Sequence, residues 1–154
     1  MANRDDAATM LDLQQRAFAE EGRRSGSTDI PPLTETVAAV VDHIQNQTAL
    51  IARDRGALVG VIRGVVNERV CTVRALAVEA EYRGRGLGSA LLGALEAALP
   101  DVTRFDLTTN TVMQGNVPFY ERHGYRITAL TRHSDIVTLA QMTKERRHAD
   151  PIAR

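Results

Sequence analysis

The feature that most constrains the fold of this chain is a glycine-rich loop between a strand pattern and a helix pattern. Residues 70–78 form an apolar run typical of a buried strand, and residues 87–99 repeat apolar side chains at helical spacing. The loop between them, residues 83–88, reads Arg-Gly-Arg-Gly-Leu-Gly. Glycines leave backbone N–H groups open, and the helix that follows adds the positive end of its dipole. The loop therefore predicts a site for phosphate or pyrophosphate.

The glycine spacing separates the known kinds of phosphate loop. A phosphate-binding Gly-x-x-x-x-Gly-Lys-Ser/Thr loop is excluded because no lysine follows Gly88. A dinucleotide-binding Gly-x-Gly-x-x-Gly motif is excluded because the glycines here do not have its spacing, although Asp106 stands where the ribose-binding acid of that motif is expected. The spacing that fits is Arg-x-x-Gly-x-Gly, formed by Arg83, Gly86 and Gly88. It resembles the coenzyme A signature of the GNAT superfamily of N-acetyltransferases. If only the three glycines are considered, an ordinary turn at the end of a hairpin is the alternative to a coenzyme-binding loop.

Composition limits the class of protein. The chain has 154 residues, enough for one domain with its own core, and 19 basic residues balance 19 acidic ones. This balance favours neither nucleic acid nor an anionic membrane as a partner. The single cysteine, Cys71, excludes an internal disulfide and is expected to be a small buried side chain. We predict a single cytoplasmic domain at residues 1–143, followed by a charged, flexible tail at residues 144–154.

The order of sequence patterns predicts an α+β fold with a mixed, mostly antiparallel sheet and helices on both faces. Turn residues separate the segments, and apolar periodicity assigns each one to a helix or a strand. We expect helices at residues 7–21, 34–47 (capped by Thr34), 87–99 and 117–122, and strands at 49–53, 58–66, 70–78, 103–109, 125–130 and 136–142.

A second motif lies downstream of the loop. Residues 116–125, Asn-Val-Pro-Phe-Tyr-Glu-Arg-His-Gly-Tyr, resemble the GNAT motif of a tyrosine-bearing helix followed by a Gly-aromatic turn. Residues 75–78, which enter the loop, and the closing run at 136–144 also resemble the family, so the likeness covers about the last half of the chain. It implies an enzyme that uses acetyl-CoA as co-substrate and acetylates an amine of a small molecule or peptide. A catalytically silent module that binds acyl-CoA is the alternative.

The resemblance also implies where the coenzyme lies. The pantetheine arm would run along the end of the central strand, at Leu76, Ala77 and Val78, and the N–H of Val78 would bind the acetyl carbonyl. The pyrophosphate would contact the residues of the loop and of the helix start: Arg83, Gly84, Arg85, Gly86, Leu87, Gly88 and Ser89.

The resemblance implies that Tyr120 is the general acid. Acetyl transfer from coenzyme A expels a thiolate, and a tyrosine hydroxyl is protonated at neutral pH and can donate to it. A buried core tyrosine is the alternative. Asn116, one helical turn earlier, is interpreted as the helix N-cap, with a coenzyme contact as the second possibility.

The acceptor amine must lose a proton before it attacks, and no base can be assigned from the sequence. Glu79 is the first candidate because it follows the central strand, although a solvated carboxylate is the alternative. Glu20, Glu21 and Asp29 could line the acceptor pocket. His123 could serve as base or line that pocket, or simply end its helix.

The chain departs from the family pattern at its N-terminus. GNAT domains commonly open with a strand, whereas residues 1–6 are short, polar and without alternation. We therefore expect the first strand to be missing or vestigial, which leaves residues 49–53 as an open sheet edge. Such an edge would allow a homodimer. No metal site is expected, because His133 and Asp135 form only a lone pair.

Overall fold

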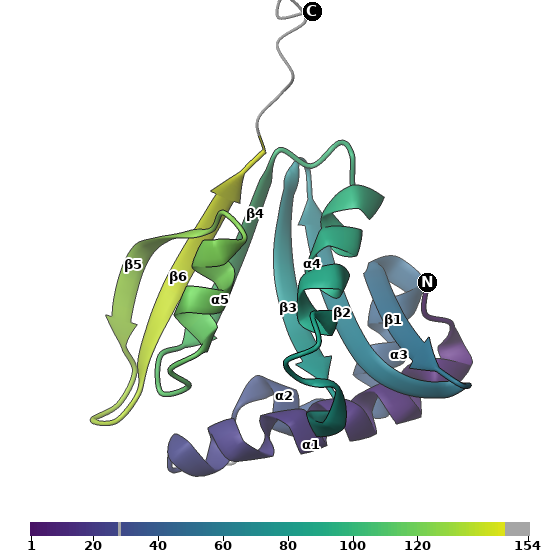
Figure 1. Cartoon of the computed structure of the whole chain (residues 1–154), viewed down its shortest axis with the longest axis horizontal. Helices are drawn as coiled ribbons and strands as arrows, with labels where there is room; N and C mark the ends of the chain where they lie inside the picture. The colour runs from purple at the N-terminus through teal and green to yellow at the C-terminus, as the bar shows by residue number, and fades with distance from the viewer. Residues whose placement is uncertain (28, 147–154) are drawn as a thin grey trace, which may run out of the picture.

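The structure, a computed structural model, describes residues 1–27 and 29–146. Six strands form one sheet in the order β1-β2-β3-β4-β6-β5, with helices on both faces (Figure 1). This confirms the predicted fold class. In chain order the elements are η1 (Arg4–Asp6), α1 (Ala7–Arg24), α2 (Pro31–Thr34), α3 (Val37–Asn46), β1 (Thr48–Asp54), β2 (Ala57–Asn67), β3 (Val70–Val78), η2 (Ala80–Tyr82), α4 (Leu87–Ala98), β4 (Arg104–Asn110), α5 (Asn116–Arg122), β5 (Arg126–Arg132) and β6 (Thr138–Glu145).

The sheet opens between β3 and β4. These two strands are parallel, and their pairing runs only from Val70 opposite Arg104 to Thr72 opposite Asp106. Beyond this point the strands diverge, as Figure 1 shows below their paired ends. A bulge interrupts the pairing of β3 with β2, and Ala75 adopts a positive φ of 51° there. The carboxyl end of β3 therefore borders a gap in the sheet instead of a neighbouring strand.

Two hydrophobic clusters hold helices against opposite faces of the sheet. On one face, Leu92 of α4 packs with Ile62 and Phe105, and side chains of α5 join this cluster. On the other face, Leu13 of α1 and Val40 of α3 pack with residues of β1 and β2. Figure 1 shows α1 crossing the open end of the sheet, from the β1 side toward the β5–β6 hairpin.

The first strand of the family pattern is missing, as the sequence predicts. Arg4–Asp6 is a single 3-10 turn, and β1 forms one edge of the sheet. One backbone bond, from the N–H of Ala2 to the carbonyl of Ala49 at 2.9 Å, stands where a first strand would pair.

The predicted helix at residues 34–47 is divided in the structure. Pro31–Thr34 forms a short turn of its own, and α3 begins at Val37. Thr36, and not Thr34, caps α3 by accepting a hydrogen bond from the N–H of Ala39 at 3.2 Å. The break is at Glu35, whose backbone is extended and whose carboxylate binds a buried arginine on β2.

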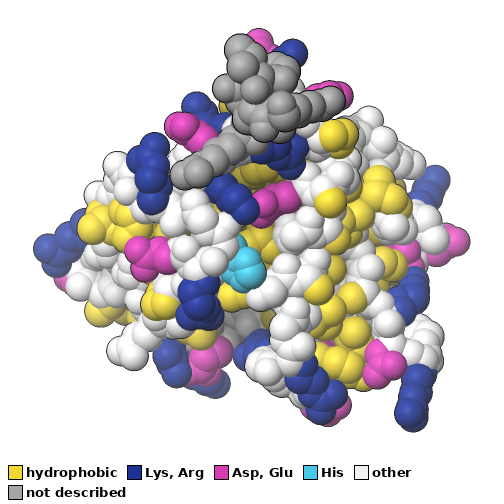
Figure 2. All heavy atoms as spheres, turned by 45° about the horizontal axis from the view of Figure 1, so that its top comes forward, with side chains coloured by type: hydrophobic (Ala, Val, Ile, Leu, Met, Phe, Trp, Pro, Cys, Tyr) yellow, Lys and Arg dark blue, Asp and Glu magenta, His cyan; other side chains and the backbone are white. Residues whose placement is uncertain are grey.

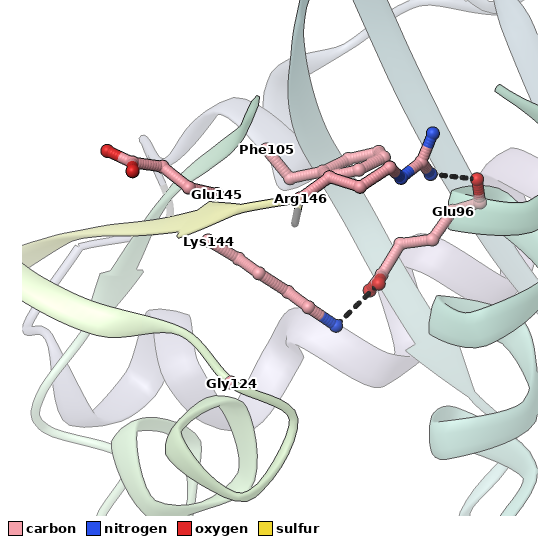
Figure 3. Close-up of a pocket in the computed structure, with 6 residues that line it drawn as sticks. All are labelled: Glu96, Phe105, Gly124, Lys144, Glu145 and Arg146. Atoms are coloured by element: carbon pink, nitrogen blue, oxygen red, sulfur yellow. Dashed lines mark hydrogen bonds and ion pairs between the residues drawn. The ribbon is translucent and has the colours of Figure 1, made fainter. Parts of the chain in front are cut away.

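The flexible tail predicted at residues 144–154 overlaps the end of β6 in the structure. Lys144 and Glu145 belong to β6, and the Lys144 ammonium binds the Glu96 carboxylate of α4 at 2.6 Å. Arg146 donates to the carbonyl of Leu99 at 2.7 Å and to that of Glu96, so it caps the carboxyl end of α4. Figure 3 shows these side chains around a hollow of about 400 Å³. Residues 147–154 lie outside the described part of the chain.

The surface mixes charges of both signs. On the face drawn in Figure 2, acidic and basic side chains alternate with apolar ones and no region carries one sign alone. None of the helices within the described ranges combines the length and apolar content that a membrane crossing requires.

Candidate active site

The glycine loop leaves a row of backbone donors open at the start of α4. Gly84 and Gly86 adopt left-handed φ angles of 75° and 82°, and a Cβ at either position would meet no atom within 4 Å. The first helical bond of α4 runs from the N–H of Ala90 to the carbonyl of Gly86, at 3.0 Å. Within the described residues, no N–H from 84 to 89 donates to another backbone carbonyl. Open donors and the helix dipole together suit a compact anion.

The two arginines of the loop lie at its rim and are exposed. The Nε of Arg83 donates to the carbonyl of Val78 at 3.3 Å, which ties the loop to the end of β3. The guanidinium of Arg85 lies 5.3 Å from the centre of the Tyr82 ring. Both side chains therefore place positive charge beside the open N–H groups.

Ser89, in the first turn of α4, is held by α5. Its hydroxyl and the Nε2 of His123 are 2.9 Å apart, and His123 is the C-cap of α5. The same imidazole lies 4.9 Å from the Phe119 ring. A Cβ at Gly88 would lie 3.5 Å from that ring. The start of α4 and the end of α5 are thus packed together beside the loop.

The end of β3 points one backbone donor into the gap. The N–H of Glu79 donates to the carbonyl of Val59 on β2, at 2.9 Å. Because successive amides of a strand point to opposite sides, the N–H of Val78 faces away from β2 and into the gap. The side chains of Leu76 and Val78 pack toward α4 and α5, and Ala77 is buried on the other face.

Tyr120 of α5 packs against the same cluster. Its ring lies edge-on to those of Phe119 and Tyr125, at centroid distances of 5.1 and 5.8 Å. Burial, and next the negative charge of Glu21, raise the pKa of Tyr120 to about 12. Among the described residues, the hydroxyls of Tyr82 and Tyr125 donate to carboxylates, whereas that of Tyr120 has no hydrogen-bond partner. The Tyr120 hydroxyl is therefore protonated and free to donate a hydrogen bond.

Asn116 is not the helix N-cap that the sequence predicts. It is the first residue of α5, and Gly115 occupies the cap position without a side-chain bond. The Nδ2 of Asn116 instead donates to the carbonyl of Asn110 at 3.5 Å. The physical reason is that the turn after β4 is closed by Asn110, whose own side chain accepts from the N–H of Val112 at 3.0 Å.

The candidate acidic residues differ in how they are paired. The carboxylate of Glu79 forms an ion pair with Arg16 of α1. Glu20 pairs with Arg23 and Arg24 on its own helix. Glu21 is half-buried, and Asp29 is exposed. An open hollow of about 520 Å³ lies at the end of α1, lined by Ala19, Gly22, Arg23, Gly26 and Ser27.

Sequence reasoning missed a buried ionic network beneath α1. The Arg63 guanidinium on β2 donates to Glu35 at 3.0 Å and to the Oε1 of Gln14 at 2.8 Å. Burial opposes the charge on Glu35, but the bonds from Arg63 and Gln14 outweigh it and lower the pKa of that carboxyl. An arginine within an apolar strand pattern is the signal that could have found this network, because a buried charge needs a partner.

Comparison with known proteins agrees with this geometry. Residues 45–127, more than half of the chain, match the family model of the acetyltransferase (GNAT) domain. No curated protein matches the sequence.

Among solved structures, the chain is similar to the ribosomal-protein-S18-alanine N-acetyltransferase of Escherichia coli, at 17% identity over 96% of this chain and 92% of that one, with a TM-score of 0.77. It is similar to Ard1 of Thermoplasma volcanium, at 21% identity over 96% and 95%, with a TM-score of 0.76. It also resembles the PaiA N-acetyltransferase of Thermoplasma acidophilum, solved in complex with coenzyme A, at 16% identity over 94% and 96%, with a TM-score of 0.73. These similarities to solved structures show the fold alone, whereas the family model matches the sequence itself. The chain therefore belongs to the GNAT family of acetyltransferases.

Proposed function

We propose that this protein transfers the acetyl group of acetyl-CoA directly to an amine of a small molecule or peptide. The observation that carries the proposal is the gap between β3 and β4, which has the open N–H groups of the glycine loop at one end and Tyr120 beside it. A long, flexible coenzyme that ends in a thioester matches such an arrangement. The pyrophosphate of the coenzyme needs hydrogen-bond donors, and its acyl group needs a position inside the protein from which water is excluded.

The coenzyme would contact two segments. The backbone of residues 83–88 and the side chain of Ser89 would hold the pyrophosphate, and Leu76, Ala77 and Val78 would line the pantetheine arm. Asn116 is proposed as a further contact. The loop fits this role because its glycines leave open space where side chains would otherwise stand.

Bound acetyl-CoA supplies the activated acyl group, and the residues of this chain polarise it and protonate the leaving group. The N–H of Val78 would bind the carbonyl oxygen as negative charge develops on it. The Tyr120 hydroxyl would give its proton to the departing thiolate, since its raised pKa keeps it protonated at neutral pH. Glu79 is the first candidate for the base on sequence grounds, but its ion pair with Arg16 makes it less available.

The acceptor amine is to be identified by screening. A peptide that begins with alanine is a reasonable first probe, because one structurally similar protein is a ribosomal-protein-alanine N-acetyltransferase. A polyamine and an aminoglycoside complete a panel of chemically distinct amines. A cytoplasmic location, and a homodimer formed through the β1 edge, remain predictions.

The experiment measures thiol release from acetyl-CoA with each amine of the panel, for the wild type, Tyr120→Phe and Tyr82→Phe. Tyr82 is the control because its hydroxyl binds Asp54, outside the gap. We expect Tyr120→Phe to lower kcat about 100-fold, within the range for a lost general acid, and Tyr82→Phe to leave it unchanged. Binding of acetyl-CoA without thiol release for any amine would instead support the silent acyl-CoA-binding alternative.

A further inference from the structure

The path of α1 across the sheet determines what its inner face can reach. Near its middle, Gln14 accepts a hydrogen bond from Arg63 of β2 at 2.8 Å. At its end, Ser25 accepts one from the Nδ2 of Asn110, at the end of β4, also at 2.8 Å. The helix therefore spans from β2, past the end of β3, to β4. This is the crossing that Figure 1 shows beneath the open end of the sheet.

Glu21 lies on the face of α1 that looks toward the gap. With 3.6 residues per turn, residues seven and eleven positions after Gln14 return to the same side of the helix. These residues are Glu21 and Ser25. Gln14 reaches β2 and Ser25 reaches β4, so the Glu21 side chain between them is directed at the separation of β3 and β4. Tyr120 approaches the same region from α5, on the other face of the sheet.

The surroundings of Glu21 differ from those of its neighbours. It is half-buried and forms no ion pair or side-chain hydrogen bond with any described residue. Burial raises its pKa, and its charge in turn raises that of Tyr120. The three arginines of α1 pair with other carboxylates: Arg24 with Glu20 at 2.7 Å, Arg23 also with Glu20, and Arg16 with Glu79. Glu21 is thus a carboxylate free to accept a proton.

We infer that Glu21 is the general base that removes the proton from the acceptor amine. This rests on the proposed function. The amine nitrogen forms a bond to the thioester carbon, the carbon–sulfur bond breaks, and the electron pair leaves with sulfur. The acceptor binds as an ammonium ion, and the Glu21 carboxylate takes one of its protons before the attack. The nitrogen gives a second proton to solvent after the attack, and the Tyr120 hydroxyl gives its proton to the thiolate. The two side chains approach the reacting atoms from opposite faces of the sheet, and solvent returns both to their starting state.

The test compares Glu21→Gln with Glu68→Gln in the full chain, using the panel amine that gives the fastest thiol release. Glu68 is the matched control because it is exposed in the turn between β2 and β3, at the opposite end of β3 from the gap. Glutamine keeps the shape of the side chain and removes its basicity. We expect Glu21→Gln to lower kcat roughly 100-fold to 10,000-fold, and Glu68→Gln to change it less than about threefold. In Glu21→Gln the acidic limb of the kcat/KM profile should move upward to the pKa of the free amine, which is about 8 for an α-amino group.

Calorimetry with acetyl-CoA separates the two proposals. Glu21→Gln should bind acetyl-CoA as tightly as the wild type, because Glu21 is not among the residues proposed to bind the coenzyme. An active wild type with an unchanged rate and pH profile in Glu21→Gln would overturn the role of Glu21 alone. A wild type that binds acetyl-CoA but acetylates no amine would overturn the proposed function, and this inference with it.

Discussion

Replacing Gly60 by alanine tests whether β2 sets the position of α4. A Cβ at Gly60 would lie 2.8 Å from the Cδ1 of Leu91 and 3.3 Å from the Cδ2 of Leu87, both on α4. Leu91 is only 5% exposed, so its side chain has little room to move aside. Overpacking of this kind costs about 1–3 kcal/mol, and alanine recovers about 0.5–1 kcal/mol of chain entropy. The difference between these two ranges is about 0–2.5 kcal/mol, and we expect a net loss near its middle, about 1 kcal/mol.

Urea unfolding measures this loss, with Gly93→Ala as the matched control. Gly93 lies in the exposed middle of α4, and a Cβ there would meet no atom within 4 Å. The same substitution should therefore stabilise the protein by up to about 1 kcal/mol. Because α4 would shift, Gly60→Ala should also weaken acetyl-CoA binding. Equal stability and equal binding in Gly60→Ala and the wild type would refute the close approach of α4 to β2.

Three further predictions concern buried polar groups. Arg63→Met should lower the free energy of unfolding by about 3–5 kcal/mol, because it leaves the Glu35 carboxylate without its partner. Urea unfolding measures this free energy, and a loss below about 1 kcal/mol would contradict the prediction. The Cys71 thiol, fully buried with its pKa raised to about 11, should resist a thiol reagent at pH 8 in the native state and react fully in guanidinium. Burial lowers the pKa of His43, so as the pH falls below about 6.5 the unfolded state takes up the proton first and stability declines. His43→Gln should show a smaller decline than the wild type between pH 7.5 and 5.5, and equal slopes would argue against a neutral, buried imidazole.

The elements with strong local patterns could be predicted from the sequence. The central strand at residues 70–78 has the predicted bounds, and the helix after the glycine loop begins at Leu87 as expected. Both are apolar segments bounded by turn residues, so short-range information is enough to define them. The loop spacing and the motif around Tyr120 are likewise local, and the family that they indicate is the one that the family model assigns.

Features that depend on contacts between distant residues could not be predicted. The break before α3 follows from Glu35 reaching Arg63, which is 28 positions away. The extension of β6 to Glu145 is accompanied by the binding of Lys144 to Glu96, 48 positions away. The inward direction of Glu21 similarly depends on how α1 is anchored at Gln14 and Ser25, whereas the sequence shows only one of several acidic residues near a helix end.

Calorimetric titration with acetyl-CoA tests the central claim most directly, on the wild type, Gly86→Glu and Gly93→Glu. Gly86→Glu adds a negative charge and a side chain at a left-handed position among the open N–H groups, whereas Gly93→Glu adds the same charge on the exposed face of α4. We predict micromolar binding to the wild type and to Gly93→Glu, and none to Gly86→Glu. No binding to the wild type, or equal binding to all three proteins, would contradict the assignment of the glycine loop as the pyrophosphate site.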